Sequence, residues 1–174
     1  MGFIKFIGGI LIFFSTTLLG FYYGGKYSHR LRNLIYMEQC IKILETEIVY
    51  GAILLPDALT SVYNKGNKCV SFIFESIKDC LLNNKKAEVY DSFIHVEPLL
   101  RDKLYFKEED IEMFLSLGRI VGSSNRQDQE KNFKLILNRI SVLEREAELE
   151  RDKNEKMFKN LGILAGLAII ILLV

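Results

Sequence analysis

Apolar positions are concentrated at the two ends of the chain. Between the ends, apolar positions are interspersed with polar ones. No charged side chain occurs from Phe6 to Gly25 or from Asn160 to Val174. A helix needs about 20 apolar residues to cross the roughly 30 Å hydrocarbon core of a bilayer, and the first segment has that length. We therefore predict a transmembrane helix in residues 1–25. The alternative is a cleaved signal peptide, but the bulky residues Phe21 to Tyr23 stand where a cleavage site needs small ones.

The uncharged segment at the C-terminal end, residues 160–174, is shorter. At about 1.5 Å rise per residue it falls short of the hydrocarbon thickness. Met157 and Phe158 extend its apolar length, and Lys156 and Lys159 can extend their ammonium groups toward the lipid headgroups. We predict a second membrane helix in residues 157–174. An interfacial or half-inserted helix is the alternative.

In the middle of the chain, residues 26–156, apolar side chains recur every three or four positions, which is the spacing of one helical face. The pattern predicts an all-α domain, a bundle of about six helices between the two membrane helices. The helices are expected at about residues 31–48, 56–63, 69–82, 86–96 and 106–121, with the last running from 125 into the C-terminal segment. The pair Glu97–Pro98 is expected to end the fourth helix. Val70–Phe74 could form a strand, but the spacing continues to Leu81 and favours a helix.

The last helix contains no Gly or Pro between residues 125 and 161, so we predict one continuous helix of more than 40 residues. Its second half has little apolar surface before Met157 and carries oppositely charged pairs four residues apart, such as Asp152 with Lys156. We interpret that half as a solvated stalk leading to the membrane.

Charge is balanced in the middle of the chain. The segment from Lys26 to Lys159 holds every charged side chain except Lys5, and its formal net charge is zero. This balance argues against nucleic-acid binding, which depends on a clustered positive potential. Basic residues follow the first membrane segment and precede the last, namely Lys26, Arg30, Arg32, Arg151, Lys153, Lys156 and Lys159. The positive-inside rule therefore places the middle domain in the cytoplasm and both termini on the other side.

Candidate chemistry is sparse. The sequence has no Gly-rich phosphate loop, no nucleophile elbow and no Cys/His spacing typical of a metal site. Cys40, Cys69 and Cys80 are interpreted as small buried side chains in a reducing compartment, and His29 and His95 as isolated residues. We therefore predict a protein that is not an enzyme and that needs no cofactor or metal.

Three pairs of glycines stand four residues apart: Gly20 and Gly24, Gly118 and Gly122, Gly162 and Gly166. In lipid such pairs let two helix backbones approach closely, so we predict that the first and last pairs pack the two membrane helices together. The middle pair either packs inside the bundle or faces a partner. With Arg126 and Gln129, which helix capping does not explain, it is a candidate protein-interaction site.

Three blocks of residues follow one another in order along the chain. They are Leu44–Gly51 followed by Ala58; Leu117–Gly118 followed by Gly122, Asn125, Arg126 and Gln129; and Asn154–Met157 followed by Lys159, Leu161–Gly162 and Gly166. With the two membrane segments around them, these blocks resemble the stage III sporulation protein AB family of endospore-forming bacteria. The resemblance extends over essentially the whole chain.

That resemblance implies a non-enzymatic platform or assembly component of the channel complex between mother cell and forespore, which endospore formation needs. It implies a location in the cell membrane on the mother-cell side, around the engulfed forespore. The implied partners are other stage III sporulation channel proteins, including a cytosolic secretion-type ATPase, because the family is similar to the cytoplasmic domains of type II secretion platform proteins. The alternative is a membrane-tethered enzyme or sensor of unknown substrate.

Overall fold

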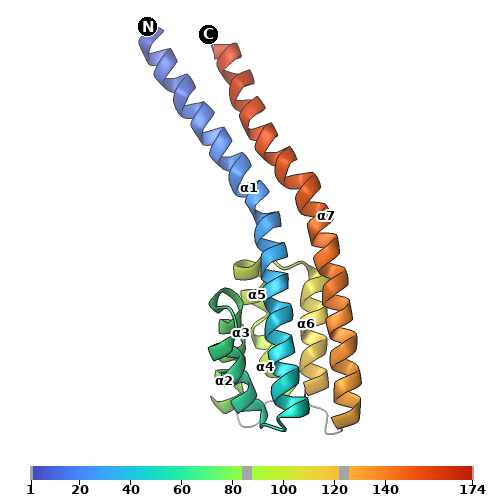
Figure 1. The fold of residues 1–174 in the computed structure, drawn as a ribbon. Helices are drawn as coiled ribbons and strands as arrows, with labels where there is room; N and C mark the ends of the chain where they lie inside the picture. The colour runs from blue at the N-terminus through green and yellow to red at the C-terminus, as the bar shows by residue number, and fades with distance from the viewer. Residues whose placement is uncertain (1, 84–87, 122–125, 174) are drawn as a thin grey trace. The chain divides into compact units, whose positions relative to one another are not determined.

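The computed structural model describes residues 2–83, 88–121 and 126–173, which are helical almost throughout and include no strand. The elements are α1 (Gly2–Glu45), a π-helical turn (Thr46–Tyr50), α2 (Leu55–Lys65), α3 (Lys68–Asn83), α4 (Val89–His95), α5 (Glu97–Leu104), α6 (Glu108–Val121) and α7 (Arg126–Leu173) (Figure 1). The predicted all-α class is confirmed. Val70–Phe74 lies within α3, and α7 is the predicted continuous helix, 48 residues long.

Contacts divide the chain into two compact units. Unit 1 comprises Met1–Leu31 and Glu146–Val174, and unit 2 comprises Arg32–Arg145. The second half of α7, interpreted as a solvated stalk, packs beside α1 within unit 1, and its side chains up to Lys159 are exposed or half-buried except for Ala147. There Ala147 is buried, Arg30 pairs with Glu150, and the ring of Tyr27 stacks on that of Phe158.

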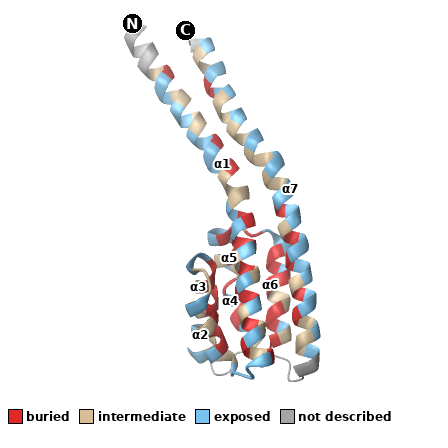
Figure 2. Ribbon diagram, viewed as in Figure 1, coloured by how far each residue is buried: buried red, intermediate tan, exposed pale blue. Residues whose placement is uncertain are grey.

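The helices of unit 2 bury part of their surface against one another (Figure 2), and most of the buried side chains are apolar. The aromatic rings at its centre come from three helices: the Phe114 ring centroid lies 5.9 Å from that of Phe74 and 5.3 Å from that of Phe93. Aromatic pairs at such separations stabilise a core beyond the area they bury. Other large, fully buried side chains of unit 2 include Leu34, Met37, Ile41, Leu44, Leu59, Ile73, Ile77, Leu100 and Phe133.

Helix α5 is the element that the sequence analysis missed. Pro98 was expected to end the fourth helix, but α4 ends at His95 and Pro98 lies in the first turn of α5. Proline is tolerated there because the first turn has no intrahelical acceptor for its missing N–H. The helix ends at Tyr105, whose backbone is left-handed (φ 58°) and whose N–H donates to the carbonyl of Leu100.

Asn33 joins α1 to the C-terminal end of α5. Its side chain is buried and donates a hydrogen bond to the Leu104 carbonyl, with 3.1 Å between the atoms. We expect Asn33→Ala to lower the free energy of unfolding by about 1 kcal/mol, the usual contribution of such a bond. Urea unfolding of a fragment from Tyr27 to Glu155 measures this. The exposed change Val142→Ala is the control, and equal losses in both variants would show that the bond adds nothing.

Candidate interaction site at the π-helical turn

A π-helical turn follows α1 directly, in the segment that carries the first sequence block. The N–H of Gly51 donates to the carbonyl of Thr46 at 2.9 Å, and the N–H of Ile53 donates to that of Glu47 at 3.1 Å. A Cβ on Gly51 would lie 2.7 Å from the Glu47 carbonyl oxygen, so a side chain here would require the backbone of the turn to shift. Single π-helical turns are uncommon and occur frequently at functional sites.

The chain leaving this turn exposes apolar side chains. Tyr50 is 61% exposed, Ile53 38% and Leu54 75%. Between them, Ala52 has a left-handed backbone (φ 50°), which costs a residue with a Cβ about 1 to 2 kcal/mol. We call Tyr50, Ile53 and Leu54 the π-turn patch. Exposed apolar side chains that stand this close in the sequence are candidates for a protein-interaction site.

Charged side chains of α2 and α7 lie near the π-helical turn, since Lys65 pairs with Glu47 and Lys134 interacts electrostatically with Tyr50. Lys65 Nζ lies 2.5 Å from Glu47 Oε1, and its hydrogen bond holds the pKa of this carboxyl below the usual range. On α7, Lys134 pairs with Glu130 at 2.8 Å. Burial raises the pKa of the nearby Glu45 carboxyl, and the positive charge of Lys134 opposes that shift. Side chains of both charge signs therefore lie near the π-helical turn.

The interaction candidates named from the sequence lie in different places. Gln129 is half-buried in the first turns of α7, one residue before Glu130. Arg126 begins α7, its side chain lies outside the described residues, and so does Gly122 as a whole. Gly118 is buried in α6, where a Cβ would lie 2.6 Å from Cγ of Phe93. Of the two alternatives predicted for Gly118, the structure favours packing inside unit 2 over an exposed partner contact.

The four glycines predicted to pack the membrane helices all lie where α1 and α7 contact each other in unit 1. Gly20 on α1 faces Gly162 on α7, Gly24 faces the backbone of Glu155, and Gly166 faces Thr16. The π-turn patch was not predicted from the sequence. Its residues lie around Gly51 rather than on a helical face, so periodicity carries no signal for them.

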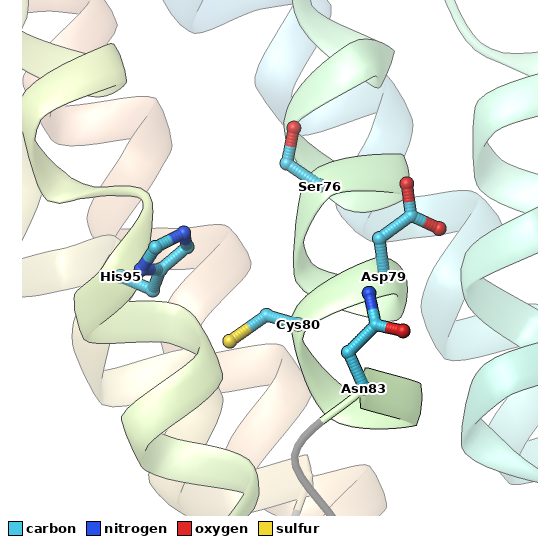
Figure 3. Close-up of a pocket in the computed structure, with 5 residues that line it drawn as sticks. All are labelled: Ser76, Asp79, Cys80, Asn83 and His95. Atoms are coloured by element: carbon cyan, nitrogen blue, oxygen red, sulfur yellow. The ribbon is translucent and has the colours of Figure 1, made fainter.

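A cavity of about 450 Å³ lies between α3 and α4, lined by Ser76, Asp79, Cys80, Asn83 and His95. Cys80 and His95 point toward one another from the two helices, whereas Asp79 points away from the pair (Figure 3). In the part of the chain that the structure describes, no three His, Cys, Asp or Glu side chains are placed to hold a metal. Zinc sites use three or four protein ligands, so two side chains here do not make one.

The cysteines differ from one another in burial. Cys40 is fully buried, and burial raises the pKa of its thiol to about 12, which makes it unreactive. Cys69 is exposed and Cys80 is half-buried. The interpretation of all three as buried small residues is therefore right for Cys40 and wrong for Cys69.

Comparison with known proteins identifies the family. The sequence model of the family described as Stage III sporulation protein AB matches residues 5–174. The chain belongs to this family. Stage III sporulation protein AB of Bacillus subtilis (strain 168) is 31% identical over 170 residues, which cover 98% of this chain and 99% of that relative. The resemblance inferred from the three sequence blocks is confirmed, and the chain is a sporulation protein.

A solved structure of a Stage III sporulation protein AB has the same fold. Its TM-score is 0.65 at 24% sequence identity, and the match covers 72% of this chain and 98% of that one. The solved chain therefore corresponds to part of the length of this chain.

Helix α1 includes the part of the chain suited to cross a membrane. Among the described residues, one helical stretch, Gly8–Tyr50, is long and apolar enough by length and composition, with a mean hydropathy of 1.2 in its most apolar window. Only 17% of that window is buried, unlike the core helix of a soluble protein. The second membrane helix, residues 157–174, stays a prediction.

Proposed function

We propose that this protein is a non-enzymatic assembly component of the channel complex between mother cell and forespore. On this proposal α1 anchors the chain in the mother-cell membrane, and unit 2 lies in the cytoplasm. Unit 2 binds other stage III sporulation channel proteins, among them a cytosolic secretion-type ATPase. Family membership, the apolar stretch of α1 and an exposed apolar patch on unit 2 support the proposal.

The π-turn patch is the observation that carries the proposal. Leu54 is its most exposed member, and complete burial of a leucine side chain contributes about 1.5 to 3 kcal/mol. Interfaces draw most of their free energy from a few apolar anchors within a polar rim. Leu54 is the expected anchor, and the Lys134–Glu130 pair belongs to the expected rim.

Leu54→Ser in the tagged full chain is expected to reduce co-purification of channel proteins from sporulating cells by about tenfold. A tenfold loss corresponds to about 1.4 kcal/mol, at the lower end of what burial of one leucine contributes. Immunoblotting of the ATPase and of the other channel proteins, together with the count of heat-resistant spores, measures the effect.

The matched control is Ile94→Ser on α4, which removes another exposed aliphatic side chain, 41% exposed. Both variants are expected to accumulate to the parent level, because neither side chain is in the core. If Leu54→Ser recovers partners as well as Ile94→Ser does, the π-turn patch is not the binding surface.

A further inference from the structure

In unit 1 the backbones of α1 and α7 touch at their glycines. A Cβ on Gly20 would lie 2.7 Å from the Phe158 carbonyl oxygen and 2.9 Å from Cα of Gly162. A Cβ on Gly162 would lie 2.7 Å from the Thr16 carbonyl oxygen. Because these neighbours are backbone atoms, a side chain at either position requires the two helices to separate.

The close contact extends along both helices. A Cβ on Gly24 would lie 3.0 Å from the Glu155 carbonyl oxygen, and one on Gly166 would lie 2.6 Å from Oγ1 of Thr16. Gly20, Gly24 and Gly166 are buried, although most of their neighbours in unit 1 are not (Figure 2). Three or more turns of each helix therefore share one interface.

Polar side chains hold the same two helices beyond the uncharged segments. Ser28 donates a hydrogen bond to Glu155 Oε2 at 2.6 Å, and hydrogen bonds from Lys159 and Ser28 hold the pKa of Glu155 below its usual range. Arg30 is 4% exposed and its Nη1 lies 2.9 Å from Glu150 Oε2. The pairs Ser28–Glu155 and Arg30–Glu150 each join α1 to α7, so they fix the register in which the glycines meet. Lys159 and Glu155 are both on α7.

The outer surfaces of the paired helices are apolar. Large exposed side chains on them include Leu11, Phe14, Leu18, Leu19, Leu161, Leu164, Leu167 and Ile171. In hydrocarbon these side chains need no protein partner, whereas helix association depends on close packing of small residues. The arrangement therefore suits two helices that lie together in lipid.

We infer that the uncharged end of α7 enters the bilayer only as the partner of α1, so that the two helices form one obligate membrane hairpin. The predicted membrane helix, residues 157–174, spans about 27 Å at about 1.5 Å per residue, and its uncharged part, residues 160–174, spans about 22 Å. Both lengths are less than the roughly 30 Å hydrocarbon core. The segment is too short to be inserted stably by itself, and we expect the glycine contacts with α1 to stabilise its insertion. This inference rests on the membrane anchoring in the proposed function and deepens it, because it names the partner of each membrane helix.

A topology reporter fused after Val174 of the full chain tests the hairpin, with a second reporter inserted near Lys65 to check orientation. In the parent protein the terminal reporter is expected on the far side of the membrane. Gly20→Leu and Gly162→Leu are expected to move at least tenfold more of it to the cytosolic side. Leucine favours insertion by its own hydrophobicity, so a loss of insertion reports the lost helix contact.

The control is Gly8→Leu on the same helix, where a Cβ meets nothing within 4 Å, and the parent topology is expected to be retained. Gly20→Ala, with one added methyl group, gives a second reading if the leucine variants are degraded, and an intermediate shift is expected. If the terminal reporter stays on the far side of the membrane in Gly20→Leu, Gly162→Leu and Gly20→Ala, the obligate pairing is overturned. A cytosolic terminal reporter in the parent would overturn the second membrane helix, whereas the Leu54→Ser result would be unaffected.

Discussion

Gly118→Leu is expected to lower the free energy of unfolding of the Tyr27–Glu155 fragment by about 1 to 3 kcal/mol or more, and its melting temperature by several degrees. A Cβ on Gly118 would lie 2.6 Å from Cγ and 2.9 Å from Cβ of Phe93. Phe93 is fully buried and its ring packs on Phe114, so it has no free space to move into. The effect is a large part of a typical total stability of about 5 to 15 kcal/mol.

Ser116→Leu is the matched control for Gly118→Leu. It adds the same side chain two residues earlier in α6, where the serine hydroxyl donates an exposed hydrogen bond to the Glu112 carbonyl. The change in stability there is expected to stay within about 0.5 kcal/mol. If the Gly118→Leu fragment melts as high as the parent or higher, close packing of α4 on α6 is refuted.

Pairing Gly118→Leu with Phe93→Ala gives a second check. Phe93→Ala alone leaves a cavity and is expected to cost about 3 to 5 kcal/mol. The added leucine can occupy part of that cavity, so the double variant is expected to be more stable than the sum of the single losses predicts. Strict additivity would mean that the two side chains do not meet.

Periodicity predicted the helices of unit 2 well, because each buries one apolar face. It failed where local backbone chemistry decides the structure. Pro98 can end one helix or begin another, and the buried Leu100 and Leu104, four residues apart, were the signal that a helix follows it. The three-and-four spacing up to Ile48 equally gave no sign that the end of the first helix widens into a π-helical turn.

The candidate site could be predicted only in part from the sequence. The block Leu44–Gly51 contains the π-helical turn. Nothing in the composition of the block, or of the residues that follow it, indicates that Tyr50 and Leu54 are exposed. The glycine spacing likewise indicates that a backbone approaches without saying which one. Gly118 meets a phenylalanine of α4, whereas Gly20 meets a glycine of α7, and only the fold distinguishes these cases.

Glu144 gives unit 2 a stability that depends on pH. Its Oε1 is buried and has no hydrogen-bond partner among the described residues. Burial raises the pKa of this carboxyl to about 7, and the negative charge of Glu38 on α1 adds to the shift while Lys42 opposes it. Glu38 itself is held by Lys42 at 2.9 Å and accepts a long hydrogen bond from Ser141 at 3.5 Å.

The sign follows from the proton balance. Between the unfolded pKa of 4.5 and the folded value of about 7, the folded chain binds more protons at Glu144 than the unfolded chain does. Stability from this group is therefore fully present below about pH 4.5 and is lost as pH rises toward 7. Glu144→Gln removes the ionisable group and keeps the shape, so it is expected to stabilise the fragment at pH 8 and to change it little at pH 4.5.

The expected gain at pH 8 is about 1 to 2 kcal/mol, less than the full shift would give because Glu144 is partly exposed to solvent. Urea unfolding of the parent and variant fragments at several pH values measures the difference. Glu112→Gln on α6 is the control, since it removes an exposed carboxyl of the same charge. Two results would contradict the expectation: a gain in stability for Glu144→Gln that is the same at pH 4.5 and pH 8, or a gain at pH 8 no larger than that for Glu112→Gln. Either would show that Glu144 ionises as freely in the folded chain as in the unfolded one.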